Sequence, residues 1–552
     1  MIRRVLLLPA LLLLLLPAHS WAQHEHASPP PAGGGVPLRK GIGDVHHAVM
    51  TRSKEAQKYF NQGLAFCFAF NHDEAVRAFE EAARLDPDCA MAHWGIAYAC
   101  GPNINLPMDA EHGRRAYDEV QQALAGKASP AEHDYIAALA RRYGKPPVGD
   151  QHAFDLAYAD AMRELVKKHP TDIDAMVLFA ESMMDLRPWD YWMPDGRPQP
   201  GTDEIVSMLE RVLKKNPKHV GAIHFYIHAV EASSNPGRAD RYAAKLPSLA
   251  PAAGHLVHMP THIYIRTGRY NDVVDLNTKA IDVDRKYLGP ERLEKGTDVY
   301  RLMYYTHNIH MRWAGYVMTG RSGEAIAAAH DVTKSVPLDA VRAMPPMEFW
   351  VPIVYFTEAR FGKWDDILNE PAPPADLRYT TAVWHYARGL ASAAKGRLDQ
   401  AAVERDSLAS IEAATPPDAA IGTDNPTKAV LHVATATLSG EIAAGQGRTD
   451  DAIASVEEAV KAQDGLRYDE PQIWYYPVRH SLVPLLLKAG RAPDAENVYR
   501  EDLRQNPGNG WSLYGLAQSL RAKGDAARAA ATEKEFRKAW AKADVSITAS
   551  AF

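Results

Sequence analysis

Histidines gather between residues 224 and 310 at spacings that bring side chains together on helices. They occur, with one glutamate, as His224-x3-His228-x2-Glu231, His255-x2-His258-x3-His262 and His307-x2-His310. Residues three or four apart lie on one face of an α-helix, with Cβ atoms about 5–6 Å apart. Imidazole is the commonest protein ligand for zinc, copper and related ions. The spacing therefore favours a transition-metal site.

Other interpretations of these histidines stay open from the sequence. Histidines in a groove can bind the carboxylate or aromatic groups of a peptide, and a single buried histidine often only satisfies a backbone group. The chain is not a zinc peptidase of the His-Glu-x-x-His type, because Phe225 follows His224. It also lacks a phosphate-binding Gly-rich loop, a G-x-S-x-G motif and a dinucleotide-binding motif. Any catalysis would depend on metal-activated water or metal redox chemistry, with Glu231 as a ligand or general base.

The composition is that of a large globular protein. At 552 residues, 46% of them apolar, the chain is too long for one compact core, which predicts several domains or a repeat array. Its net charge of −6 lacks the basic excess that nucleic-acid binding needs, so we expect no nucleic-acid partner. Cys67, Cys89 and Cys100 form no disulfide framework and no Cys-x2-Cys motif, and each is expected to be buried.

The first residues have the pattern of a secretory signal peptide. Arg3 and Arg4 precede the apolar run 5–16, and the small residues Ser20 and Ala22 stand where a signal peptidase cleaves. We expect residues 1–22 to be removed and the mature chain to be periplasmic or secreted, with a flexible Pro/Gly-rich leader over 23–43. No later stretch of about 18 apolar residues predicts a membrane span.

A period of 34 residues organises the remaining chain. Residues typical of a helix–turn–helix unit occur between 56 and 89 as Tyr59, Gly63, Phe66, Ala75, Phe79, Ala82 and Pro87. The small residues let two helices approach closely, and the proline ends the second helix. This unit resembles the tetratricopeptide repeat at almost every consensus position. The resemblance covers nearly the whole mature chain and is strongest at 56–89, 254–287, 306–339 and 476–543.

The resemblance implies an all-α, right-handed superhelical solenoid of about twelve helix–turn–helix pairs over 44–545, followed by a tail at 546–552. First helices are expected to start near residues 56, 90, 130, 173, 220, 254, 306, 348, 382, 433, 476 and 510. Insertions between the units are predicted to be loops at 101–108, 187–200, 284–298, 368–379, 413–427 and 463–473. The insertion at 187–198 is aromatic, and either closes over a groove or packs on its rim.

The repeat frame places the histidines on one surface. In this repeat family, positions 2, 5, 9 and 12 of each first helix line the concave face of the superhelix. The predicted ligands at these positions are His224, His228, His258, His262, His307 and His310, with His255 and Glu231 at the edge. We expect them to converge on copper or zinc. The alternative function is a metal-free scaffold of the cell envelope that holds a peptide, a protein segment or a small ligand in the same groove.

Overall fold

The computed structural model describes residues 36–146 and 148–551, which are mostly helical. The expected signal peptide and most of the expected leader lie outside these residues. Within the described part of the chain, no helix is both long and apolar enough to cross a membrane. The cysteines Cys67, Cys89 and Cys100 are free thiols and buried, as expected.

Helical pairs follow one another along the chain. The first six are α1 (Lys54–Cys67) with α2 (His72–Leu85), α3 (Ala90–Ala99) with α4 (Ala110–Ala125), α5 (Pro130–Leu139) with α6 (Gln151–Lys168), α7 (Ile173–Met184) with α8 (Thr202–Lys215), α9 (Val220–Val230) with α10 (Asp240–Ala243) and α11 (Leu246–Leu249), and α12 (Gly254–His258) and α13 (Pro260–Arg266) with α14 (Tyr270–Lys295). The next six are α15 (Thr306–Met318) with α16 (Ser322–Ser335), α18 (Ile353–Arg360) with α19 (Trp364–Asn369), α20 (Arg378–Ala394) with α21 (Leu398–Ala414), α22 (Thr427–Gly445) with α23 (Thr449–Asp464), α24 (Arg479–Lys488) with α25 (Ala492–Gln505), and α26 (Gly510–Ala522) with α27 (Ala526–Ala539). The predicted all-α repeat solenoid is confirmed.

Shorter elements connect the pairs. They are the 3₁₀ turns η1 (Ala140–Arg142), η2 (Pro236–Ala239) and η4 (Pro345–Trp350), the π-helix η3 (Tyr300–Tyr305), the helix α17 (Leu338–Ala343), and the strands β1 (Ala420–Ile421) and β2 (Asn425–Pro426). The two strands pair antiparallel and lie in the predicted insertion at 413–427.

Small residues at helix crossings explain why consecutive helices pack closely. The ring of Phe79 on α2 fills the space beside Gly63 on α1 and Gly95 on α3, where an added Cβ atom would lie 2.6 and 2.4 Å from that ring. A side chain at either glycine would force the helices apart, which costs packing energy. The consensus pattern seen in the sequence is thus a pattern of interhelical contact.

One predicted insertion was wrong. Residues 284–298 were expected to be a loop because of Gly289 and Pro290, but α14 extends to Lys295. Gly289 interrupts the helix with φ of 71°, and Pro290 then occupies the first turn of a helix that resumes. Proline is well tolerated in a first helical turn because it needs no N–H partner there.

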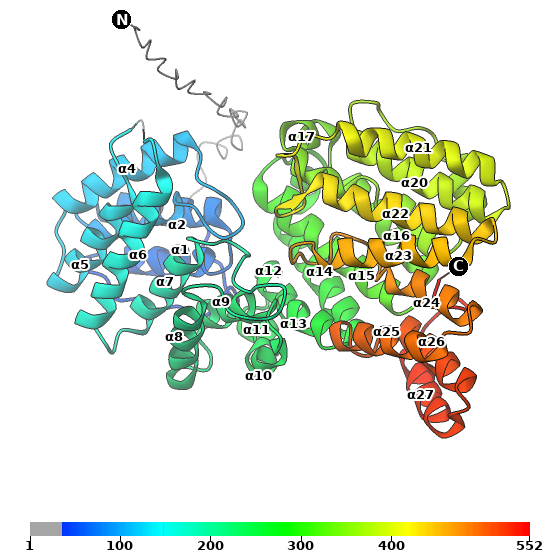
Figure 1. Ribbon diagram of the computed structural model, residues 1–552. Helices are drawn as coiled ribbons and strands as arrows, with labels where there is room; N and C mark the ends of the chain where they lie inside the picture. The colour runs from blue at the N-terminus through cyan, green and yellow to red at the C-terminus, as the bar shows by residue number, and fades with distance from the viewer. Residues whose placement is uncertain (1–35, 147, 552) are drawn as a thin grey trace, which may run out of the picture.

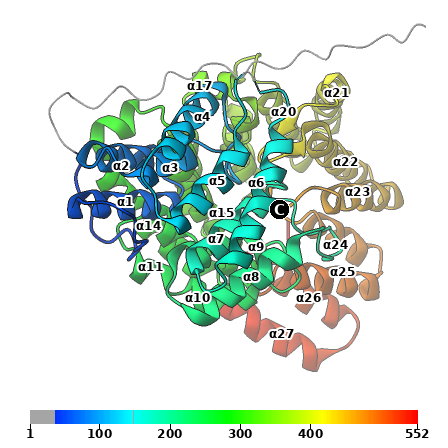
Figure 2. The ribbon, with the colours of Figure 1, turned by 90° about the vertical axis from the view of Figure 1, so that its left-hand side faces the viewer.

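The solenoid folds back on its own middle. Figure 1 shows α1–α8 on one side of the molecule, α15–α26 on the other, and α12 and α13 between them; in Figure 2 the N-terminal helices form the near layer. The C-terminal units contact α15 and α16: Trp511 Nε1 donates to the carbonyl oxygen of Val317 (3.1 Å), and Asp544 accepts from the backbone N–H groups of Ser322 and Gly323. The N-terminal units also contact the middle of the array, since Asn71 and Asn105 donate to the hydroxyl oxygens of Tyr287 and Tyr304.

Candidate metal centre

Three consecutive first helices supply the histidines. Helix α9 is buried along its whole length and begins after His219, whose Nδ1 accepts the N–H of Ala222. Helices α12 and α13 form one rod, because Met259 between them keeps helical angles (φ −50°, ψ −36°) although Pro260 lacks an N–H group. Helix α15 continues directly from the π-helix η3. Helical spacing is thus preserved through every histidine of the cluster.

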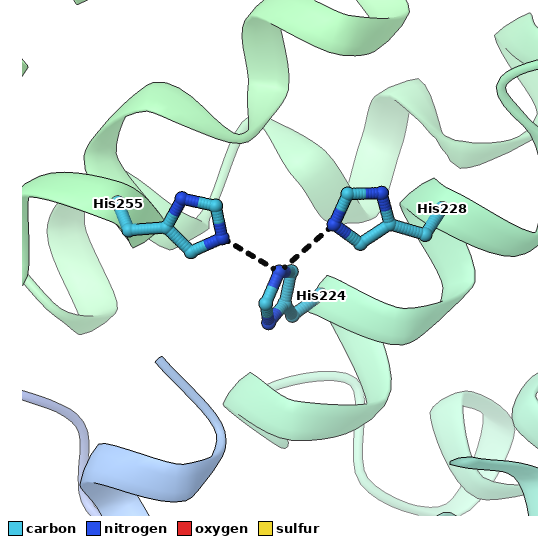
Figure 3. Close-up of side chains that lie close together, drawn as sticks. All are labelled: His224, His228 and His255. Carbon is cyan, nitrogen blue, oxygen red and sulfur yellow. Dashed lines mark hydrogen bonds between the residues drawn. The ribbon is translucent and has the colours of Figure 1, made fainter. Parts of the chain in front are cut away.

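The first triad consists of His224, His228 and His255. Nε2 of His224 lies 3.2 Å from Nε2 of His228 and 3.0 Å from Nε2 of His255 (Figure 3). Nitrogen ligands of a tetrahedral zinc ion, with bonds near 2.0 Å, stand about 3.3 Å apart. The separations of His224 from the other two nitrogens are therefore close to what one ion would require, and all three nitrogens lie within 4.8 Å of one another.

The second triad consists of His258, His262 and His307. Nε2 of His262 lies 2.7 Å from Nε2 of His258 and 3.5 Å from Nε2 of His307. In each triad the three ligand atoms lie within 4.8 Å of one another. His307 is half-buried, whereas the other five rings are at most 2% exposed. The two triads share the middle rod, since His255 belongs to the first and the other two histidines of that rod to the second.

Acceptors behind two of the rings determine which ring nitrogen carries the proton. His224 Nδ1 lies 2.7 Å from the carbonyl oxygen of Phe68, and His258 Nδ1 lies 2.6 Å from Oδ1 of Asn277. The orientation of Asn277 follows from its Nδ2, which donates to the carbonyl oxygen of Val273. Because these oxygens only accept, each Nδ1 must donate, and each neutral ring keeps a lone pair on Nε2.

Glu231 orients one histidine of each triad. Its Oε1 lies 2.9 Å from His228 Nδ1 and its Oε2 lies 2.6 Å from His262 Nδ1. Burial opposes ionisation of Glu231, but the charges of His262 and His228 outweigh this effect and lower its pKa. A carboxylate behind a metal-binding imidazole fixes the ring orientation and makes the ring a better ligand.

Glu470 also belongs to the centre, although the sequence analysis did not predict it. It lies in the loop between α23 and α24, and its Oε2 is 2.6 Å from His262 Nδ1. A single N–H cannot donate fully to both Glu231 and Glu470, and neither oxygen of Glu470 has a hydrogen-bond donor of good geometry. Burial raises the pKa of Glu470, and the charge of Glu231 adds to this effect. The repeat frame predicted only a rim loop here, and no local pattern marked this glutamate.

The imidazoles differ sharply in charge. Burial, followed by the neighbouring imidazoles, lowers the pKa of His224, His255 and His307 well below the ordinary value, and burial together with His262 does the same for His258. Burial also disfavours protonation of His262, but the charges of Glu470 and Glu231 outweigh it and raise its pKa to about 10. Without a metal, His262 is therefore the ring of the cluster that is held as a cation, beside Glu231 and Glu470.

Two strained aromatic residues cover the first triad. Phe70 (φ 54°) and Trp189 (φ 62°) are the residues other than glycine with positive φ in the described chain. Both rings contact His228, with centroid separations of 5.9 and 5.3 Å. Trp189 is held there by a hydrogen bond from its Nε1 to Oδ1 of Asn105. Backbone strain of this kind concentrates at functional sites, and the aromatic insertion at 187–198 does close over the histidines.

The structure corrects three expectations about individual residues. His310 does not join the triads: its Nδ1 accepts the N–H of Trp350 (3.2 Å) and its ring stacks on Trp313. His255, expected at the edge, is a full member of the first triad, and Glu231, also expected at the edge, lies between the triads. The surface expected to be an open groove is a buried centre, because the N-terminal turn at Phe70 and the loops carrying Trp189 and Glu470 fill it.

Comparison with known proteins identifies the scaffold. Residues 60–123 and 480–544 match the sequence model of the tetratricopeptide repeat. The chain therefore carries tetratricopeptide repeats in its first and last units, which confirms the resemblance seen in the sequence. No curated protein matches the chain.

A search of solved structures matches the human IFIT1 dimer with PPP-AAAA. The sequence identity is 12% and the TM-score is 0.34, and the match covers 88% of this chain and 91% of that one. Another is the APC/C hetero-tetramer Cut9-Hcn1, at 12% identity and a TM-score of 0.28, covering 89% of this chain and 88% of that one. Likeness at this level supports no statement about partners or activity.

Proposed function

We propose that this protein binds a transition metal, copper or zinc, in the histidine cluster at the centre of its tetratricopeptide-repeat solenoid. The observation that carries the proposal is the pair His224 and His228. Their Nδ1 protons are donated to Phe68 and Glu231, so two Nε2 lone pairs face each other at 3.2 Å in a buried site. Facing lone pairs repel, and a cation bound by both nitrogens turns this repulsion into two favourable bonds.

The chemistry of the donors selects the kind of metal. The converging atoms are imidazole nitrogens, which suit zinc and copper, whereas magnesium and calcium prefer shells of oxygen ligands. The acceptors behind the rings, Asn277 Oδ1 and the Glu231 carboxylate among them, are of the kind that orients histidine ligands in metal sites. The covering rings of Phe70 and Trp189 lower the local dielectric constant and exclude competing water.

The solenoid adds a second property, since tetratricopeptide repeats present extended surfaces for binding proteins and peptides. A metal-free peptide scaffold was the alternative from the sequence. Burial of the histidines favours an ion over a peptide at this place, because a peptide would have to displace both Phe70 and Trp189.

We also propose that the protein works outside the cytoplasm, as the N-terminal pattern indicates. Expression of the full chain in its host, followed by cell fractionation and N-terminal sequencing, checks this point. The expected mature N-terminus follows residue 22. An intact N-terminus on a cytoplasmic protein would contradict the assignment.

Elemental analysis of the purified exported protein tests the metal proposal. We expect copper or zinc to co-purify, and His228→Ala and His262→Ala to lose metal while far-ultraviolet circular dichroism stays unchanged. His310→Ala is the matched control, because His310 is an equally buried histidine whose ring contacts Trp350 instead. The proposal fails if the wild-type protein neither contains a transition metal nor binds added zinc or copper tightly.

A further inference from the structure

The histidine cluster has two centres of convergence. Each short contact between ring Nε2 atoms joins members of the same triad: His224 with His228 and His255, and His262 with His258 and His307. Among the described residues, no hydrogen bond joins ring nitrogens of different triads. Between the triads the rings make only ring-to-ring contacts: His228 and His262 meet edge to face at a centroid separation of 5.2 Å. His255 and His258 stack at a centroid separation of 5.8 Å.

Each triad is a complete set of three ligands. Three imidazoles whose nitrogens stand about 3.3 Å apart can hold one tetrahedral ion and leave its fourth position free. An ion placed in the first triad would not satisfy His258 and His262, whose Nε2 atoms are 2.7 Å apart in the second. One ion therefore leaves the three nitrogens of the other triad without a metal.

Two acidic groups provide the negative charge that a pair of ions would need. Glu231 accepts from His228 with one oxygen and from His262 with the other, so a single carboxylate supports a ligand of each triad. Glu470 adds a second buried carboxyl group, whose Oε2 lies 2.6 Å from His262 Nδ1. Within a low-dielectric site, such charges offset much of the repulsion between neighbouring cations.

From this arrangement we infer that the protein holds two metal ions, one in His224, His228 and His255 and the other in His258, His262 and His307, coupled through Glu231. The inference rests on the proposed metal-binding function and adds the number and position of the ions. Each ion has three protein ligands and one position for a ligand that the protein does not supply. Burial of the rings restricts that ligand to a small oxygen donor, such as water or hydroxide.

Metal stoichiometry separates the possibilities. The full chain is stripped with a chelator and loaded with excess Cu²⁺, and unbound metal is removed before copper and protein are both measured. We expect two equivalents for the wild-type protein. His255→Ala and His307→Ala should each keep one equivalent, because each change removes a ligand from one triad only. His310→Ala, the control on the same helix as His307, should keep two.

The outcomes distinguish this inference from the proposed function. One equivalent in the wild-type protein overturns the two-ion centre but leaves metal binding standing, whereas no bound copper overturns both. Loss of both ions in each single variant, with helix content retained, would overturn the assignment of one ion to each triad.

Electron paramagnetic resonance of the wild-type protein provides a measurement that does not depend on how the variants fold. Two neighbouring Cu²⁺ ions interact magnetically, so the detected signal should fall below the total copper content at full loading. A signal equal to the copper content at every loading would contradict a coupled pair.

Discussion

At the scale of single residues, the hydrogen bond on one ring nitrogen decides what a buried histidine can do. His224 donates from Nδ1 to the Phe68 carbonyl, which leaves Nε2 free to bind a metal. His310 sits one helical turn from His307 and is buried like His224, but its Nδ1 accepts the N–H of Trp350 and its ring stacks on Trp313. The same residue type can therefore offer a metal ligand in one place and act as a packed core residue in the other.

Away from the cluster, the hydrogen bonds of His47 and His219 to Asp174 should make a pH-dependent contribution to stability. Asp174 accepts from His47 (2.8 Å) and His219 (2.9 Å). Burial raises the pKa of Asp174, but these two hydrogen bonds outweigh it and hold the pKa well below the ordinary value. Burial lowers the pKa of His47, but the hydrogen bond and charge of Asp174, with Asp172 and Glu132, raise it overall.

The sign of each shift defines a pH window. The Asp174 contribution is complete above its unfolded pKa and is lost as pH falls, whereas the His47 contribution is complete below its unfolded pKa and is lost as pH rises. Asp174→Asn should therefore destabilise the protein most between about pH 4 and 6.5, by about 1–3 kcal/mol. Denaturant unfolding across pH 3–9 measures this, with Asn at the exposed Asp399 as the control. A difference that does not vary with pH would contradict the assignment.

At the scale of elements, connecting segments complete a site that the repeat helices only begin. The turn between α1 and α2 brings Phe70, the loop between α7 and α8 brings Trp189, and the loop between α23 and α24 brings Glu470. The helices provide rigid ligand spacing, and the loops provide cover and charge. Loops can be strained or rearranged without disturbing the interhelical packing of the solenoid.

Trp189→Ala should open the first triad to solvent. The expected result is a several-fold faster loss of metal to an added chelator, with the stoichiometry unchanged, because the ligands themselves remain. Arg197→Ala changes an exposed residue of the same loop, whose partner is Asp195, and serves as the control. Stopped-flow measurement of metal transfer to a coloured chelator gives the two rates. Equal rates would mean that Trp189 does not limit access.

At the scale of the whole molecule, the candidate metal centre lies between the two sides of the solenoid. Its ligands come from α9, from the rod of α12 and α13, and from α15, which lie between the N-terminal and C-terminal units (Figure 1). Any ion bound there stabilises the folded array relative to the unfolded chain. The gain is about 2.7 kcal/mol when free metal is at 100 times its dissociation constant.

Metal should accordingly raise the melting temperature and slow hydrogen exchange most strongly in α9–α15. Differential scanning calorimetry and hydrogen-exchange mass spectrometry, with and without zinc, check both effects. The double variant His224→Ala/His258→Ala removes one ligand from each triad and should show neither effect. An equal gain in that variant would place the stabilising ion elsewhere.

The sequence by itself determined the helical pairs and the histidine spacing. Helices α3, α5, α7, α9, α12, α15 and α26 start at the predicted residues 90, 130, 173, 220, 254, 306 and 510. Both features are local. A glycine at a helix crossing sets the packing of one helix pair, and two histidines four residues apart share one face of a single helix.

Only the tertiary structure decided which residues complete the centre. His224 meets Phe68 from 156 positions away, and His262 meets Glu470 across most of the C-terminal half. Whether His255 or His310 belongs to a triad depends on how far each helix is rotated about its axis. These contacts depend on the path of the superhelix, which is the sum of many small rotations between neighbouring units, and no short-range pattern in the chain records that sum.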